Sequence, residues 1–180
     1  TTIGGGSAGG DPFAMSGAAE VRMFEADLPD QTGEAASTFV PRFLAATTYD
    51  AAIRRFTPGL LDEVRGIADG SGQPFATMFA YQLIDELWAQ VRSLKQEKCT
   101  SLGLARTGEL PTIVAQNLDI PTWMQTHPTL LRIHHCDSDL QSLVVTFPGL
   151  IGAMGMNNGK VAVAVNTVLQ LAPCRDGLPV

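Results

Sequence analysis

The spacing of apolar residues changes near the middle of this 180-residue chain. From Phe39 to Val91, apolar residues recur at intervals of three and four, which predicts helices that each bury one face. After Cys99 the interval falls to two, the repeat of a β-strand. Helices followed by strands predict an α+β fold.

Proline and glycine mark the ends of the predicted helices. Thr57 and Pro58 are expected to begin one helix, the segment 70–72 to end it, and Pro74 to begin the next. Solvated helix faces are expected to carry Asp62, Glu63, Asp85 and Glu86. The apolar stripes expected to form the core contain Phe43, Tyr49, Ile53, Phe56, Leu60, Leu61, Val64, Ile67, Phe75, Met78, Phe79, Leu83, Leu87, Trp88 and Val91. Ahead of them, Val21, Met23 and Phe24 are expected to form one brief strand.

The second half predicts an antiparallel meander. Its expected strands are Thr100–Ala105, Thr112–Leu118, Leu130–His134, Leu143–Thr146 and Val161–Asn166. Gly108 and the run Asn157-Asn158-Gly159 are the expected turns. The run 161–165 has little polar alternation, so we expect a strand buried on both faces. Such a meander leaves edges open, so we expect the chain to hold part of its fold, with another chain or segment completing the sheet.

Charge and cysteine content narrow the function classes. The net charge is −6 and no basic run occurs, which argues against a nucleic-acid partner. No apolar stretch is long enough for a membrane span. The three cysteines are an odd number, so at least one thiol is free, which favours a reducing, cytoplasmic compartment. Residues 1–12 have linker composition and predict a disordered leader.

Cys99 is the residue with the strongest chemical signal, because it lies where the helical pattern ends and the strand pattern begins. A histidine, a helix N-terminus or its own α-amino group could activate its thiol. The histidine candidates are His127, His134 and His135. The α-amino group has a pKa near neutrality but exists only if Cys99 is a chain terminus. We therefore interpret Cys99 as a nucleophile exposed by self-cleavage at the Lys98–Cys99 bond.

In that reaction the thiol attacks the Lys98 carbonyl, and water then releases the new terminus from the thioester. Thr100 and Ser101 offer hydroxyls for positioning, and Asp119 is the expected orienting carboxylate. Asn117 and Asn166, at strand ends, are expected amide donors to an oxyanion. Simpler interpretations are a buried structural cysteine at 99 and an ordinary turn residue at 119.

An ordered set of motifs carries a resemblance over roughly residues 40–180. The motifs are the helical segment 60–70, Cys99-Thr100-Ser101, Gln116-Asn117-Leu118-Asp119, Pro148-Gly149-Leu150-Ile151-Gly152, Gly155-Met156-Asn157, Gly159 and Val165-Asn166. In this order they resemble the penicillin acyltransferase-like, cysteine autoproteolytic family of N-terminal-nucleophile hydrolases. Bile salt hydrolases and penicillin V acylases are similar in the cysteine, Asn-Leu-Asp and terminal Asn segments, but lack so long a helical region before the cysteine.

The resemblance implies a four-layer αββα sandwich with a helical pro-region at 13–98 and a β-rich subunit from 99. It implies a zymogen in which Cys99 is the catalytic nucleophile, Asp119 orients it, and Asn166 contributes to the oxyanion hole or substrate pocket. The expected substrate is an acylated amine or acyl-thioester, with no cofactor. The family chain continues further and supplies more strands, an oxyanion Asn and an Arg, which have no counterpart here.

Within enzymes, the alternative is a related amidase of the bile-salt or penicillin V acylase kind, acting on acylated amino acids or bile-salt-like conjugates. Two other classes of function are also considered. The chain could be a non-catalytic binding module on the same fold. A metal site built from His134, His135, Cys136 and Cys174 is disfavoured, because adjacent ligands in a strand diverge and no metal-binding spacing occurs. We therefore expect no metal.

Overall fold

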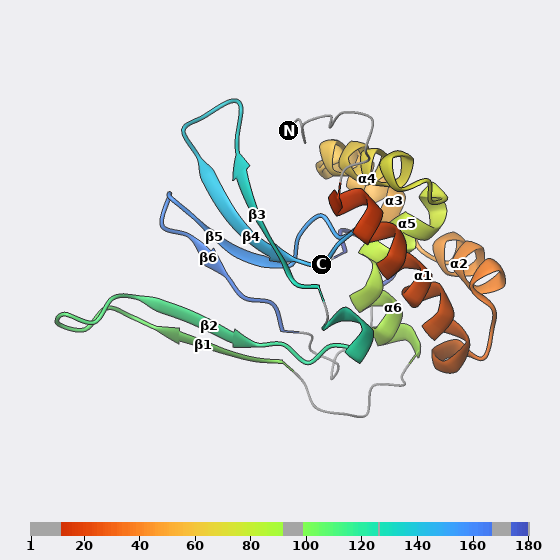
Figure 1. Ribbon diagram of the computed structural model, residues 1–180, viewed down its shortest axis with the longest axis horizontal. Helices are drawn as coiled ribbons and strands as arrows, with labels where there is room; N and C mark the ends of the chain where they lie inside the picture. Colours follow the sequence, from red (N-terminus) through yellow and green to blue (C-terminus); the bar gives the residue numbers. More distant parts are fainter. Residues whose placement is uncertain (1–11, 92–98, 126, 167–173, 180) are drawn as a thin grey trace. The chain divides into compact units, whose positions relative to one another are not determined.

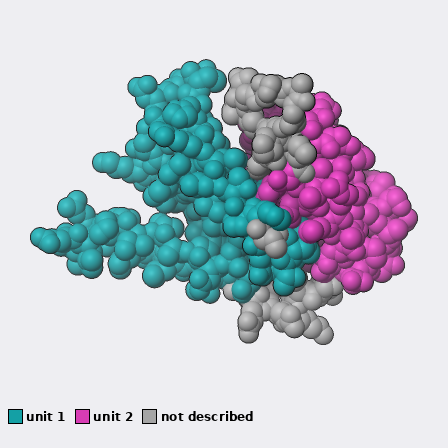
Figure 2. Space-filling view, viewed as in Figure 1, with its two compact units in different colours: residues 1, 96–147, 152–168 teal, residues 2–95, 148–151, 169–180 magenta. Residues whose placement is uncertain are grey.

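The computed structural model describes residues 12–91, 99–125, 127–166 and 174–179. They divide into two compact units, coloured separately in Figure 2. The helical unit contains residues 12–91, 148–151 and 174–179, and the strand unit contains the described residues of 99–147 and 152–166. This content confirms the predicted α+β class. Of the predicted leader, residues 1–11 lie outside the described residues, whereas Pro12 begins the first helix.

The helices and strands described in the helical unit are all α-helices (Figure 1). They are α1 (Pro12–Thr32), α2 (Ala36–Ala45), α3 (Tyr49–Phe56), α4 (Pro58–Ser71), α5 (Phe75–Gln82) and α6 (Ile84–Val91). Helix α1 packs against α2, α4 and α5, and α4 also packs against α3 and α5. None of the described helices combines the length and apolar character needed to cross a bilayer.

The brief strand expected at residues 21–24 is wrong, because this segment lies inside α1. Val21, Phe24 and Leu28 are buried, at the three- and four-residue spacing of a helix face, whereas Met23 is exposed. A strand would have put Val21 and Met23 on one face. The Phe24 ring lies 5.4 Å from that of Tyr81, centroid to centroid.

The later helices follow the prediction closely. Pro58 is the first residue of α4, and Gly72 ends it in the left-handed conformation with φ of 67°. Most of the predicted stripe is buried, but Phe56 and Leu60 are exposed. The predicted helix after Pro74 is divided at Leu83 into α5 and α6. Glu86 is not the fully solvated residue that was expected, since one of its carboxylate oxygens is buried.

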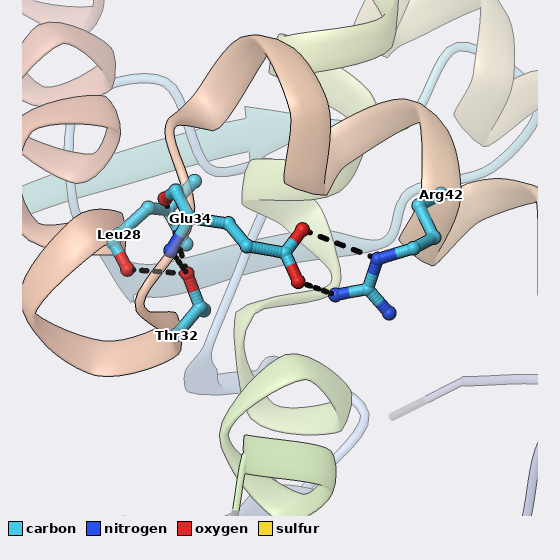
Figure 3. A network of polar contacts seen from close by, with 4 residues as sticks. All are labelled: Leu28, Thr32, Glu34 and Arg42. Atoms are coloured by element: carbon cyan, nitrogen blue, oxygen red, sulfur yellow. Dashed lines mark hydrogen bonds and ion pairs between the residues drawn. The ribbon is translucent and has the colours of Figure 1, made fainter.

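A small polar network fixes the connection between α1 and α2 (Figure 3). The Thr32 hydroxyl donates to the Leu28 carbonyl at 2.7 Å and accepts from the Glu34 amide at 3.1 Å. The Glu34 carboxylate accepts two hydrogen bonds from Arg42, at 2.7 and 3.2 Å. Because this ion pair is exposed, its main effect is on the direction of the turn rather than on stability.

Two short segments from beyond residue 99 belong to the helical unit. In the first, Gln82 Nε2 donates to the Gly149 carbonyl at 2.8 Å, and the Ile151 amide donates to Gln82 Oε1 at 3.0 Å. Gly149 has a φ of +90°, and a Cβ on Gly17 would lie 3.1 Å from the Gly149 Cα, so both positions need glycine. The helical unit therefore extends beyond the predicted pro-region 13–98.

The second segment contains Cys174 and Arg175. The Thr48 amide donates to the Arg175 carbonyl at 2.9 Å, and the Tyr49 hydroxyl donates to the Cys174 carbonyl. Burial, followed by the charge of Glu86, raises the pKa of Tyr49. These hydrogen bonds join the start of α3 to a segment more than a hundred residues later in the chain.

The strand unit contains a hairpin and a four-stranded meander (Figure 1). The hairpin pairs β1 (Thr100–Leu104) with β2 (Ile113–Asn117), and the antiparallel meander contains β3 (Thr129–His134), β4 (Gln141–Thr146), β5 (Met154–Asn157) and β6 (Ala162–Val163). The first four strands lie within two residues of their predicted bounds. The turn predicted at 157–159 is confirmed between β5 and β6.

Two expectations for the end of the meander need correction. Strand β5 was not predicted, because a four-residue run of Met, Gly and Asn lacks the usual strand composition. Gly155 is nevertheless required there, since a Cβ would lie 2.3 Å from the Leu143 carbonyl oxygen. The predicted strand 161–166 is reduced to β6, and Val161 and Val163 are 56% and 55% exposed rather than buried on both faces. Strand β6 pairs with β5 alone, so it is an edge of the described sheet.

Candidate functional site

Cys99 lies immediately before β1, where the strand unit begins in the described chain. It is half-buried, and all three cysteines carry free thiols. Cys136 and Cys174 are exposed. Lys98, on the other side of the predicted cleavage point, lies outside the described residues. The structure thus describes the predicted nucleophile but not the residue on the other side of the predicted cleavage point.

The register of the hairpin decides which of the predicted site residues next to Cys99 share a face. Thr100 pairs with Asn117, and Ser101 pairs with Gln116. Paired residues lie on the same face, and successive residues alternate between faces. Ser101 and Gln116 therefore share one face. Thr100 and Asn117, both predicted supporting residues, lie on the opposite face.

Asn166 reaches the hairpin on the face that carries Ser101. Its side-chain Nδ2 donates to Ser101 Oγ at 3.0 Å, across 65 residues of sequence. Ser101 is only two residues from Cys99, so Asn166 lies beside the start of β1. The structure thus brings two of the predicted site residues, Ser101 and Asn166, into contact two residues along the chain from Cys99.

Gln116 holds the backbone next to Asn166. The Val165 amide donates to Gln116 Oε1 at 3.0 Å, and Gln116 Nε2 donates in return to the Val165 carbonyl. From the sequence, Gln116 was recognisable only as part of a motif, with no predicted role. Its signal was a long amide side chain directly across the strand pair from Ser101, which becomes visible only once the register is known.

Asp119 lies at the predicted level but without the predicted contact. Asn117 is opposite Thr100, so the chain two residues later has returned to the neighbourhood of Cys99. Asp119 is exposed. Among the hydrogen bonds of the described residues, none joins the Asp119 carboxylate to Cys99. The expected hydrogen bond is therefore absent here, whereas the antiparallel return that motivated it is present.

Two of the three candidate histidines belong to the β3–β4 hairpin. His134 ends β3 and is exposed, and His135 Nε2 lies 3.0 Å from Ser142 Oγ of β4. No group of three or more His, Cys, Asp or Glu residues within the described part of the chain could hold a metal ion. His135 has a local partner in the β3–β4 hairpin, which accounts for its half-buried position without a site.

A scan against protein-family models and a search of curated proteins both found nothing that matches this chain.

Proposed function

We propose that this chain is a self-cleaving cysteine amidohydrolase or acyltransferase with Cys99 as its nucleophile, of the penicillin acyltransferase-like kind. One observation supports it above the others. Asn166 donates a hydrogen bond to Ser101, which lies two residues after Cys99. A thiol with an amide donor beside it is the minimum set for acyl transfer, since one attacks the acyl carbon and the other stabilises the oxyanion.

In the proposed reaction, cleavage before Cys99 frees its α-amino group. The amine takes the thiol proton, the sulfur adds to the acyl carbon of an amide or thioester, and the amine passes the proton to the leaving group. Water or an acceptor amine then attacks the thioester and releases the acyl group, which restores the thiol. The amine that Asp119 is proposed to orient exists only after cleavage, so that hydrogen bond belongs to the cut form.

A layered fold is the architecture that we propose for the strand unit. Leu130, Leu143, Val145 and Met156 lie on one face of the four-stranded sheet and are exposed, Leu130 at 63%. An apolar sheet face is stable in water only when another layer covers it. This supports a four-layer αββα sandwich in which a further chain or segment supplies the missing cover.

A non-catalytic binding module is the second candidate, and the exposed Asp119 favours it. Intact mass separates the two functions. The proposed enzyme yields two pieces divided between residues 98 and 99, whereas a binding module keeps its full mass.

Substitution tests which cysteine is responsible for cleavage. Cys99→Ala should abolish both cleavage and hydrolysis of acyl-amide and acyl-thioester substrates, because one sulfur does both. Cys99→Ser should retain slow cleavage at most, since a hydroxyl is the weaker nucleophile. Cys136→Ala and Cys174→Ala are the matched controls and should behave as the parent protein. Full activity of an uncut chain, or equal damage from Cys136→Ala, contradicts the proposal.

A further inference from the structure

The Gln116 side chain forms hydrogen bonds that normally belong to a strand backbone. Its amide oxygen and nitrogen bond to the N–H and C=O of one residue, Val165. An antiparallel strand residue exchanges the same two bonds with its partner. Gln116 is half-buried, and its own backbone is paired with Ser101 in the hairpin. One residue thus joins β1 through its backbone and the segment after β6 through its side chain.

This double hydrogen bond determines where Asn166 can lie. Strand β6 ends at Val163, so ladder pairing does not hold residues 164–166. Bonds to both the amide and the carbonyl of Val165 fix the peptide plane that leads into Asn166. The Asn166 Nδ2 then lies 3.0 Å from Ser101 Oγ, and Ser101 is the cross-strand partner of Gln116. Gln116, Asn166 and Ser101 are thus connected in sequence: Gln116 bonds to Val165, Val165 precedes Asn166, and Asn166 bonds to Ser101, which pairs with Gln116.

We propose that Gln116 is a positioning residue, which holds the Asn166 amide beside Cys99 so that it can donate to the oxyanion of the acyl group. In the resting protein Asn166 Nδ2 donates to Ser101 Oγ. When the oxyanion forms, Asn166 Nδ2 donates to the oxyanion instead. The proposal rests on the proposed function for its catalytic consequence. Its geometric part, that Gln116 sets the position of Asn166, stands independently.

The geometric part is tested without any substrate. In Gln116→Met, which keeps the length of the side chain but removes both bonds, hydrogen exchange at the Val165 amide should accelerate at least 10-fold and the NMR signal of the Asn166 side-chain amide should shift. The amides of β1 and β2 should keep their protection. Gln82→Met is the matched control, because Gln82 also forms two hydrogen bonds to backbone groups, the Gly149 carbonyl and the Ile151 amide in the helical unit, and it should leave the Asn166 signal unchanged.

Gln116→Glu should restore the position of Asn166 at low pH only, which a merely space-filling role of Gln116 does not predict. An ionised carboxylate can accept from the Val165 amide but cannot donate to its carbonyl. A protonated carboxyl can do both. The Asn166 signal of Gln116→Glu should therefore return toward that of the parent protein as the pH falls below about 4.3, while Gln116→Met stays shifted.

Kinetics test the catalytic part. Gln116→Met should lower kcat about 10²-fold, the cost expected of a small misplacement in an active site, and leave KM nearly unchanged. In an Asn166→Ala background the same substitution should have no further effect on kcat, because Gln116 acts through Asn166.

The outcomes separate the two proposals. The positioning role is overturned if Gln116→Met changes neither hydrogen exchange at the Val165 amide nor the Asn166 NMR signal. It is also overturned if Gln116→Met keeps the full kcat of an active parent protein, or if its loss of kcat adds to that of Asn166→Ala. A parent protein that neither cleaves nor turns over substrate contradicts the proposed function instead, and the NMR result then decides the geometric part.

Discussion

Gln116 and Gln82 each bind both a backbone N–H and a backbone C=O that lie outside the strand ladders. Gln116 bonds to Val165 in the strand unit, and Gln82 bonds to Gly149 and Ile151 in the helical unit. An amide side chain suits this role because its oxygen accepts and its nitrogen donates. Each bond contributes about 1 kcal/mol net, and an orphaned buried group costs more than that. Residues that look like ordinary polar positions in the sequence therefore fix two irregular segments.

Asp119→Asn tests the most specific assignment at the residue scale. Asparagine keeps the shape of the side chain but removes its charge, so the amine of cleaved Cys99 would lose its orienting partner. Turnover should fall by about 10²–10⁴-fold with the fold unchanged, as measured by steady-state kinetics and circular dichroism.

The competing interpretation gives the opposite result for this substitution. Asp119 is exposed and lies two residues before Pro121, so it could simply belong to the turn. Asparagine would serve equally well in that role. Near-normal turnover in Asp119→Asn would remove Asp119 from the mechanism while leaving Cys99 in it.

At the scale of elements, the strength of the local pattern decides what the sequence could predict. Helix α4 was predicted almost to the residue, because Pro58 and Gly72 constrain its ends directly. Helix α1 was missed at residues 21–24, since three apolar residues are too few to separate a period of two from one of 3.6. Strand β6 was predicted too long, because the valine run carries strand propensity but only β5 pairs with it.

The residues of the candidate site could be predicted from the sequence, but their contacts could not. Cys99, Ser101 and Asn166 could be selected by residue type and order, but the Ser101–Asn166 contact depends on pairing between distant segments. No local pattern shows such pairing. The role of Gln116 was missed for that reason, and the opposite faces of Thr100 and Ser101 became clear only from the register.

Gly155→Ala tests the packing of the meander. The added Cβ would lie 2.3 Å from the Leu143 carbonyl oxygen, so β4 and β5 must move apart. We expect a loss of about 1–3 kcal/mol in the free energy of unfolding, measured by denaturant titration.

Gly103→Ala is its matched control. Gly103 also lies within a strand, but nothing lies within 4 Å of a Cβ there. Alanine should be neutral or stabilising by up to about 1 kcal/mol, because glycine loses more freedom on folding. Equal destabilisation by both substitutions would contradict the steric account of Gly155.

At the scale of the whole molecule, buried tyrosines give the helical unit a predictable alkaline limit. Burial, and after it the charge of Glu20, raises the pKa of Tyr81 above its ordinary value. The folded state then keeps the phenol proton more tightly than the unfolded state does. Stability from this group is complete below about pH 10 and should decline above it, by about 1.4 kcal/mol per pH unit. Thermal unfolding between pH 8 and 11 measures this decline.

Tyr81→Phe isolates the contribution of that phenol. Its stability should depend less steeply on pH above 10 than that of the parent protein. A part of the slope should persist, because the pKa of Tyr49 is also raised. An unchanged slope in Tyr81→Phe would show that Tyr81 is not the group responsible.

The helical unit contains residues from both sides of position 99, so cleavage there should leave the two pieces bound to each other. Residues 148–151 and 174–179 lie beyond the cleavage point but belong to the same unit as the helices. The two pieces should therefore copurify in native buffer and separate in denaturant. Gln82→Met removes two of the bonds between them and should weaken their association by about 1–3 kcal/mol, measured by size-exclusion chromatography over a urea series.

Gln73→Met is the control for that series, since Gln73 lies between α4 and α5 in the same unit. It should leave the association unchanged. Pieces that separate without denaturant would contradict the prediction, as would equal weakening by the two substitutions.

The hydrogen bond between Gln82 and Ile151, which are 69 residues apart, cannot form until the ribosome has made the later residue. At a ribosomal rate of about 5–20 residues per second, Gln82 waits roughly 3–14 s for this partner to be made. The helices emerge first but remain an unfinished unit for that interval. A nucleophile that cut the nascent chain early would detach helices that have not yet acquired their closing segment. For the proposed self-cleavage, the order compatible with this unit is cleavage after translation rather than during it.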